Sequence, residues 1–479
     1  MKNKNIYLLR LLLLFFSYTA VQGQTKKWTL KECVGYAIAN NISVKQADLD
    51  IQDVNIDKRA AIGNFLPTVN ANASHSWNIG LNQNITTGLL ENQTSQFTSG
   101  SLNVNITIYN GLQNQNRLRR SKLSMIAAQY RSTKIRDDIS LNVANAFLQI
   151  LFNKENLKVQ QEQEINNQKQ MERTRQLVEA GSVPRGDLLD IQATVAGSRQ
   201  AVVTAENTLL ISKLSLAQLL QLKDFETFDI DDQGYNVEDT TMLEPPSSIL
   251  EKARQQRVEL KIAKINLEIA ERDIKIAKGG YQPSLQGFYS FSSRVAYSDR
   301  IIGVAPDANN PFSVIGQVQG TGESVIGPNL SPVLRNPASF FDQFSDNKGQ
   351  SFGVQLTIPI LNGFSVRNAV ERSKVSYERS RIASQQAELD LERNVYTAIT
   401  DARGALNAYE AAVAAAEART EAFNYARERF AVGLMNAFDL SQAQTLYVNS
   451  QSDVIRTKYE YIFRVKVVNF YSGIPIIQN

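Results

Sequence analysis

The sequence is poor in the residue types from which enzymes build reactive and metal-binding sites. Its 479 residues include one histidine, His75, and one cysteine, Cys33, so a multi-histidine metal site or an intrachain disulfide cannot form. No phosphate-binding loop, nucleophile elbow or pair of catalytic carboxylates is recognisable. We therefore predict no catalytic residue, no metal and no cofactor, and an enzyme is the least favoured class. Cys33 lacks a histidine partner and is expected to be a small buried residue.

The sequence also lacks an excess of charge and, beyond its start, a long apolar run. Residues 1–23 have the features of a signal peptide: a basic start, an apolar stretch and a small residue at the end. Three of the 51 basic residues lie there, which leaves 48 against 47 acidic ones, so no nucleic-acid partner is expected. No later stretch reaches the about 20 apolar residues of a membrane-spanning helix. We expect an exported protein that can cross a membrane only with strands.

What the sequence does contain is a duplication. Residues 65–69 (FLPTV) resemble residues 281–285 (YQPSL), 216 positions later. Residues 108–111 (IYNG) resemble residues 360–363 (ILNG), 252 positions later, and Gly181 and Gly433 have the same separation. The offsets differ by 36 residues, which places an insertion of that length between the two motifs. Two copies of one unit are typical of a repeating architecture rather than of a single active site.

The duplication predicts the organisation of the chain. A signal peptide (1–23) precedes repeat 1 (24–221), an acidic linker (222–246), repeat 2 (247–473) and a C-terminal tail (474–479). Repeat 1 has a helix over about 30–64, a β-hairpin over about 66–109 with a loop over 83–97, a long helix over 112–180 and a return helix over 187–221. Repeat 2 has a helix over about 247–280, a hairpin over about 283–361, a long helix over 364–432 and a return helix over 439–472. Its external loop, 298–350, holds five of the 12 prolines, which argues against a packed domain there.

The hairpins alternate apolar and polar residues with a period of two, over a length that can span a membrane. In repeat 1 the apolar positions run from Val69 to Leu81, and in repeat 2 from Phe352 to Ile360. One face of each strand suits lipid and the other suits water. The predicted water-filled lumen is lined by Asn70, Asn72, Ser74, Ser76, Asn78, Asn103, Asn105, Gln355 and Thr357. His75 falls on the apolar face, where an interfacial role is expected rather than chemistry.

The long helical stretches are too long to lie within a membrane. Neither contains a proline, and an apolar seam of four heptads predicts a coiled coil. The seam consists of Val395, Ile399, Ala402, Leu406, Tyr409, Val413, Ala416, Thr420 and Phe423. Each stretch measures roughly 100 Å at 1.5 Å per residue, against about 30 Å for the bilayer core. Each ends at a glycine, and Asp187 and Asp439 are the predicted N-caps of the return helices.

Four amphipathic strands cannot close a barrel, and open sheet edges are not tolerated in lipid, so several copies must assemble. Here the chain resembles the TolC-like outer-membrane efflux protein family, the outer membrane factors. The resemblance covers the mature chain and rests on Thr29-Leu30, on Leu66-Pro67, on the Asn-Gly pairs at 110–111 and 362–363, and on the GLMNAFDL turn at 433–440. It implies an α+β membrane protein: a trimeric twelve-stranded outer-membrane β-barrel continuous with a long periplasmic α-helical, coiled-coil barrel.

The resemblance also implies a function and its residues. The chain would be the passive exit duct of a tripartite efflux or type I secretion system. Its partners would be itself as a homotrimer, outer-membrane lipid, a periplasmic adaptor (membrane fusion) protein and an inner-membrane transporter of the RND or ABC type. The adaptor-docking tip would comprise Gly181, Ser182, Val183, Asp187, Gly433, Leu434 and Met435. Asp439 would form the periplasmic gate. Gln442 occupies a position at which some members carry a second Asp, so a single acidic ring is expected.

Alternatives accompany these expectations. An exported coiled-coil scaffold or adaptor without a pore would explain the long helices, although it has little use for the strand alternation. Asp439 could serve only as a helix cap. Trp77, Tyr109, Tyr289 and Phe291 could form an aromatic girdle at the membrane interface, with ordinary packing as the competing explanation. The sequence does not name the exported substrate.

Overall fold

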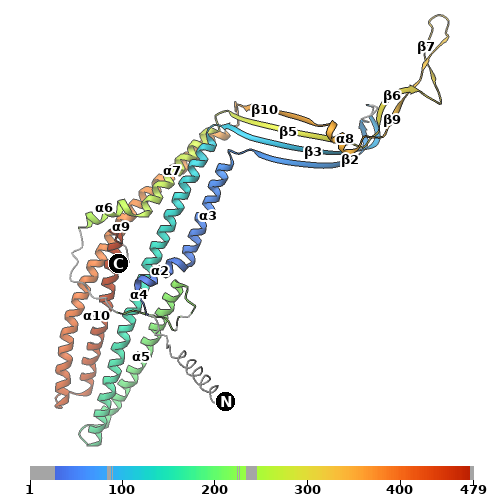
Figure 1. The fold of residues 1–479 in the computed structure, drawn as a ribbon. Helices are drawn as coiled ribbons and strands as arrows, with labels where there is room; N and C mark the ends of the chain where they lie inside the picture. Colours follow the sequence, from blue (N-terminus) through green and yellow to red (C-terminus); the bar gives the residue numbers. More distant parts are fainter. Residues whose placement is uncertain are drawn as a thin grey trace, which may run out of the picture. The chain divides into compact units, whose positions relative to one another are not determined.

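The computed structural model describes residues 27–83, 88, 90–223, 225, 227–232 and 245–474 (Figure 1). The predicted signal peptide 1–23, residues 233–244 of the predicted linker and residues 475–479 of the predicted tail lie outside the described residues. The chain divides into two compact units. The helical unit comprises residues up to 56, 122–270 and 376 onward, and the strand unit comprises residues 57–121 and 271–375. Among the described residues, no helix combines the length and apolar composition that a bilayer crossing requires.

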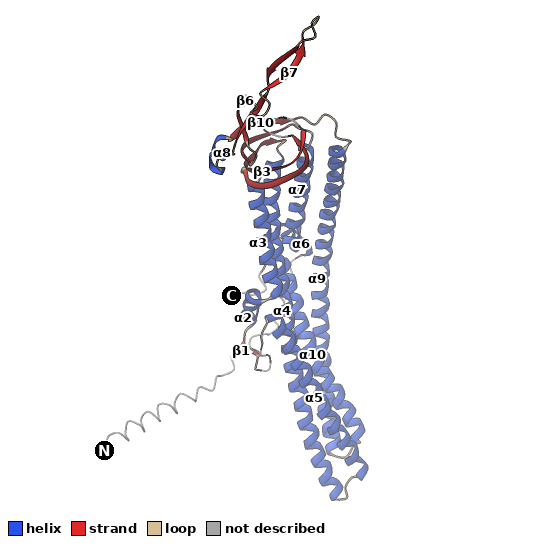
Figure 2. Ribbon diagram, turned by 90° about the vertical axis from the view of Figure 1, so that its right-hand side faces the viewer, coloured by secondary structure: helices blue, strands red, loops and turns tan. Residues whose placement is uncertain are grey.

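Two very long helices and two return helices dominate the chain, as Figure 2 shows in blue. Helices α4 (Gln113–Glu179) and α9 (Ser365–Ala431) have 67 residues each and start 252 positions apart. Their return helices are α5 (Arg185–Leu220) and α10 (Ala437–Tyr471), which begin two residues before positions 187 and 439. These four helices contain no proline, so no backbone hydrogen bond within them is lost to a missing N–H.

The helices predicted over 30–64 and 247–280 are each two helices, so both predictions were wrong in this respect. The first is divided into α2 (Leu30–Asn40) and α3 (Ile42–Gly63), and the second into α6 (Pro246–Gln256) and α7 (Val258–Gly279). The breaks fall at Asn41 and Arg257, both extended and both buried. The Asn41 side chain donates to the Leu219 carbonyl, and the Arg257 guanidinium lies 3.7 Å from the centre of the Phe470 ring. Contacts with the ends of the return helices therefore stabilise each break.

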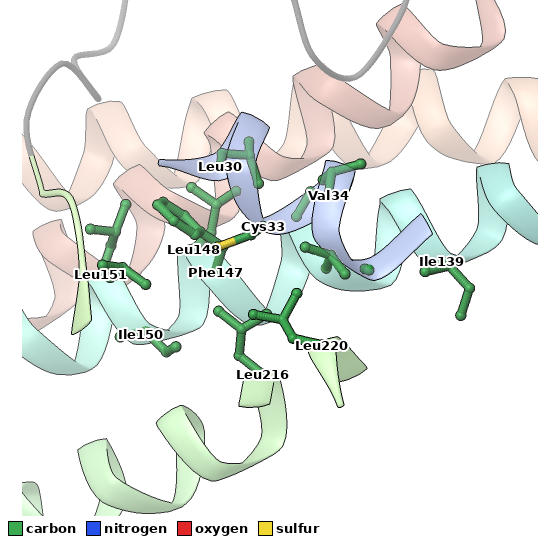
Figure 3. Packing of buried hydrophobic residues seen from close by; sticks show 14 of the residues in the cluster. Leu30, Cys33, Val34, Ile139, Phe147, Leu148, Ile150, Leu151, Leu216 and Leu220 are labelled. Carbon is green, nitrogen blue, oxygen red and sulfur yellow. The ribbon is translucent and has the colours of Figure 1, made fainter. Parts of the chain in front are cut away.

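The main core of the helical unit lies where α2 meets α4 and α5 (Figure 3). Thr29 and Glu32 form a capping box that starts α2, as the sequence predicts for Thr29. The α2 side chains Leu30, Cys33 and Val34 pack against Phe147 of α4, and Leu216 and Leu220 belong to the same cluster. Cys33 is fully buried, as expected, and burial raises its thiol pKa to about 12, which removes it from thiolate chemistry.

A short parallel strand pair ties the start of the described chain to the linker. Strand β1 (Lys27–Trp28) pairs with β4 (Asp229–Ile230). The Asp229 carboxylate forms ion pairs with Lys154 of α4, at an N–O distance of 3.0 Å, and with Lys213 of α5, at 3.1 Å. Burial would raise the pKa of Asp229, but hydrogen bonds from these two ammonium groups outweigh it and hold that pKa below its ordinary value.

The strand unit contains one four-stranded antiparallel sheet with the order β10-β5-β3-β2. Its strands are β2 (Thr68–Gln83), β3 (Leu90–Asn110), β5 (Ser284–Ala296) and β10 (Gly349–Thr357). Two predictions were wrong here. β3 begins inside the expected loop 83–97, and β10 ends at Thr357 rather than near Ile360, because Pro359 cannot donate to a ladder. Within one chain, β2 and β10 are the outer strands of the sheet.

The predicted external loop 298–350 contains secondary structure that the sequence reasoning missed. Strands β6 (Arg300–Pro306) and β9 (Leu330–Arg335) form one two-stranded ribbon, and β7 (Phe312–Gln317) and β8 (Ser324–Pro328) form another. Helix α8 (Phe340–Asp346) then leads into β10. The ribbons leave large apolar side chains such as Val304 and Ile315 exposed, in keeping with the expectation of no packed domain.

Candidate channel lining and tip

The sheet gathers the nine residues predicted to line a lumen onto one face. Cross-strand partners lie on the same face of a sheet, and so do residues two apart along a strand. Asn70 pairs with Asn103, and Asn103 pairs with Ser290 of β5. In the same way Gln286 links Thr107 of β3 to Gln355 of β10. This surface, the polar face, therefore runs across all four strands.

The polar face is built from neutral hydrogen-bonding groups. The Ser74 and Ser99 hydroxyls lie 2.7 Å apart, and Ser290 donates to the Asn103 side-chain oxygen at 2.9 Å. A hollow of 250 Å³ opens on this face, lined by Asn103, Asn105, Gln286, Phe288, Tyr289, Ser290 and Gln355. Short amides and hydroxyls satisfy one another here and leave further donors and acceptors for water.

One charged side chain interrupts this neutral surface. Among residues 68–83, 97–110, 284–296 and 349–357 of the described strands, Arg294 alone is charged. It follows Ser290 and Ser292 on the polar face, and its guanidinium lies 3.6 Å from the centre of the buried Phe97 ring. The sequence reasoning missed this pair because Arg294 and Phe97 are adjacent only through the register of β3 with β5.

The opposite surface, the apolar face, is exposed within one chain. It carries Val69, Trp77, Leu102 and Phe352, all with large exposed fractions. His75 lies there as predicted: its Nδ1 is 2.7 Å from the Thr98 hydroxyl and its ring is edge-on to Trp77. Exposed apolar strand residues next to aromatic side chains are the arrangement found where strands meet lipid.

The two turns that join long and return helices have the same backbone structure. Gly181 and Gly433 have φ of 73° and 77°, a region that glycine adopts without steric cost. The Ser182 amide donates to the Leu177 carbonyl at 2.8 Å, and the Leu434 amide donates to the Arg429 carbonyl at 2.9 Å. Both turns are Schellman motifs, which end α4 and α9 and reverse the chain within a few residues.

The predicted N-caps at Asp187 and Asp439 were wrong. Pro184 occupies the cap position of α5 without a side-chain bond, and Asn436 caps α10. The Asn436 side-chain oxygen accepts from the Asp439 amide at 2.8 Å, so Asp439 is the third residue of its helix and Asp187 the third of α5. An acidic side chain still suits this position because the first turn carries the positive end of the helix dipole. The Asp439 carboxylate is therefore not the group that caps α10.

Asp439 and Gln442 lie together on one exposed side of α10. The opposite side carries Leu440, Gln444 and Val448, which are buried. Gln444 donates to the Asn167 side-chain oxygen of α4 at 2.6 Å, and Gln163 donates to the same oxygen at 3.2 Å. This buried amide cluster, which the sequence reasoning missed, holds α10 against α4 and turns the exposed side away from that contact.

The predicted tip residues differ in exposure. Gly181, Ser182, Gly433 and Leu434 are exposed, whereas Val183, Asp187 and Met435 are partly buried. The second turn also exposes two large apolar side chains outside the predicted set, Val432 and Phe438. Val432 directly precedes Gly433, so a search for apolar residues beside the glycine would have found it, whereas Phe438 lies five residues farther on, next to Asp439.

A comparison with protein families identifies this architecture. The model of the family described as outer membrane efflux protein matches residues 34–221 and 249–465, which is most of the chain. The chain belongs to the outer membrane efflux protein family. This efflux protein lies in the outer membrane and extends into the periplasm, and its family is a class of transport channels. Among the described residues, no cluster of three or more His, Cys, Asp or Glu side chains suits a metal ion.

Individual relatives of this efflux protein agree with the family. The outer membrane protein TolC of Vibrio cholerae is 25% identical over 350 residues, which cover 71% of this chain and 68% of that protein. The fold is shared with the solved structure of CusC, at a TM-score of 0.74 and 15% identity, covering 93% of this chain and 92% of that one. The CmeC outer membrane channel of Campylobacter jejuni gives a TM-score of 0.71 at 18% identity, covering 94% and 87%.

Proposed function

We propose that this efflux protein is the passive exit duct of a tripartite efflux or type I secretion system. Three copies, each with two structural repeats, would close a barrel of twelve strands, because each chain supplies four. The observation that carries the proposal is the sheet, which has two open edges, one polar face and one exposed apolar face. Open edges must be paired in lipid. Pairing β10 of one copy with β2 of the next satisfies both edges and encloses the polar face around a lumen.

The periplasmic end would contain the gate. Asp439 and Gln442 share the exposed side of α10, and the contacts of Gln444 with α4 leave that side available to face a lumen. In a trimer, three Asp439 carboxylates would form one acidic ring, while Gln442 adds hydrogen-bonding capacity but no charge. Such a ring attracts cations, since like charges in a narrow passage focus the field.

The two glycine turns would dock the periplasmic adaptor. The exposed Val432, Leu434 and Phe438 give the second turn an apolar surface, which a partner helix with an apolar face can cover. The adaptor would connect the duct to an inner-membrane transporter of the RND or ABC type, which supplies the energy. Shifts of the return helices would open the gate, and substrate would leave by diffusion.

Single-channel recording tests this function. Purified protein reconstituted in a planar bilayer should conduct, and divalent cations added on the side of the helix turns should block it. Asp439→Asn should weaken that block by about fivefold, the equivalent of about 1 kcal/mol for an exposed carboxylate contact. The matched control is Asp190→Asn, an exposed carboxylate in the early part of the other return helix. A trimer that does not conduct would favour the pore-free scaffold, and equal effects of both substitutions would contradict the gate assignment.

A further inference from the structure

Helix α8 is fixed to the edge of the sheet at the point where β10 ends. The β10–β5 ladder stops at the pair Gly349 and Ser292, four residues before the end of β5. Beyond it, the Gln343 amide accepts from the Ala296 backbone N–H at 3.1 Å and donates to the Ala296 carbonyl at 3.0 Å. Asn347 donates to the Arg294 carbonyl at 2.7 Å. These amides take the place of a neighbouring strand, so the end of β5 is closed to strand addition.

The same anchoring places α8 on the apolar face. The Ser293 hydroxyl donates to the Phe344 carbonyl at 2.7 Å. The Phe344 ring lies against Gly100, where an added Cβ would come within 3.3 Å of it, and it contacts the Phe291 ring at a centroid distance of 6.3 Å. Gly100, Phe291 and Ser293 are in register with Ala73 and Leu102, which belong to the apolar face.

The exposed side of α8 carries aromatic rings next to the polar side chains of Asp342, Ser345 and Asp346. Phe340 stacks on Phe344, and the Phe341 side chain is 80% exposed. Farther along the same face, the Tyr297 hydroxyl lies 2.9 Å from that of Thr98, and its ring contacts His75. Rings exposed beside polar groups at the end of an apolar strand surface are typical of the boundary between lipid headgroups and acyl chains.

We propose that α8 is a membrane-interface anchor, which inserts Phe340 and Phe341 into the outer leaflet of the outer membrane beside the strands. The inference rests on the proposed function, because it requires the apolar face to meet lipid. Lipid is the occupant that the structure favours over a second copy of the chain. The aromatic surface continues the apolar face, and Gln343 and Asn347 close the end of β5 to a further strand, which leaves β10 as the edge that pairs with the next copy. The rigid amide anchoring means that α8 sets the depth of the strands in the leaflet.

Tryptophan quenching by brominated lipid tests the anchor. The chain has two tryptophans, Trp28 and Trp77, so Trp28→Phe leaves Trp77 as a native reporter on the apolar face. In the Trp28→Phe, Trp77→Phe background, Phe341→Trp reports on α8 and Ser74→Trp reports on the polar face. Each full-length trimer is reconstituted in phosphatidylcholine vesicles whose acyl chains are brominated near the headgroup or near the chain end. Heat-modifiable migration of the trimer on a gel shows that each variant has folded.

The proposal expects Phe341→Trp to lose at least about half of its fluorescence to bromine near the headgroup, and less to bromine at the chain end, as for a side chain about 5–10 Å deep. Trp77 should also be quenched, and the Ser74→Trp reporter should respond only to an aqueous quencher. If the aqueous quencher alone reaches position 341 while Trp77 is quenched by lipid, the anchor is refuted and the duct stands. Protection of position 341 from both quenchers would mean that protein covers α8, which also refutes the anchor. A Trp77 that lipid does not quench would refute the proposed function itself.

Discussion

The buried amide cluster between α4 and α10 gives the most direct test of how the tip is held together. Asn167 is 2% exposed and Gln444 is 8% exposed, and they share a hydrogen bond of 2.6 Å. Gln444→Leu removes the donor, so the Asn167 oxygen keeps only the longer bond from Gln163. Losing one of the two hydrogen bonds to this oxygen costs about 0.5–1.5 kcal/mol. The substitution should therefore favour local separation of α10 from α4 by that amount.

Hydrogen exchange of the α10 backbone amides measures this separation directly, because local opening limits exchange in a stable helix. A cost of about 0.5–1.5 kcal/mol predicts exchange about 2- to 13-fold faster near position 444. Asn167→Leu combined with Gln444→Leu should recover much of the loss, since replacing both partners by apolar groups is nearly neutral. The control is Gln442→Leu, the same chemical change on the exposed side of α10. Equal exchange rates in Gln442→Leu and Gln444→Leu would refute the reasoning.

Three further predictions concern other parts of the helical unit. Gly433→Ala places a side chain on a backbone with φ of 77°, so it should destabilise the second turn by about 1–2 kcal/mol. Hydrogen exchange of the backbone amides of residues 430–436 should become correspondingly faster. The depressed pKa of Asp229 means that its ion pairs stabilise the fold above its unfolded pKa of about 3.9, and this contribution is lost as pH falls through the lower folded value. Lys154→Met removes one of the two ammonium groups, so β1 should separate from β4 at a higher pH than in the unsubstituted protein. The fluorescence of Trp28, measured in a Trp77→Phe background, reports the pH of this separation. Arg257→Met removes the cation stacked on Phe470, a contact worth about 0.5–2 kcal/mol, and should lower the melting temperature of the protein in detergent. An unchanged melting temperature would contradict an anchored break.

The sequence predicted features that depend on local periodicity. The period of two along residues 69–81 gave the two faces of β2, because a strand alternates its side chains whatever it pairs with. The absence of proline from residues 113–179 allowed α4 to be predicted within one residue at each end. Gly181 and Gly433 marked both turns, since a helix that ends in the left-handed region usually needs glycine there.

Features that depend on contacts between distant residues were not predictable in this way. Asn41 and Arg257 interrupt apolar patterns that look continuously helical, and their partners are about 180 to 210 residues away in sequence. The N-cap of α10 was misassigned because Asn436 and Asp439 are both good capping residues, and only the backbone conformation distinguishes them. Helix α8 was missed because seven residues are too few for a periodic signal, and it is stabilised by the edge of β5 rather than by its own propensity.

The paired breaks at Asn41 and Arg257 also have a mechanical consequence. They interrupt only the helices that lead into strands, whereas α4 and α9 continue for 67 residues without a joint. Each of these two long helices is thus hydrogen-bonded without interruption up to its glycine turn, and a bending or twisting load applied at the turn is transmitted along it. The segments α2–α3 and α6–α7 each contain one extended, buried residue that is held to the end of a return helix. A shift of either return helix would therefore be passed through its buried joint to α3 or α7.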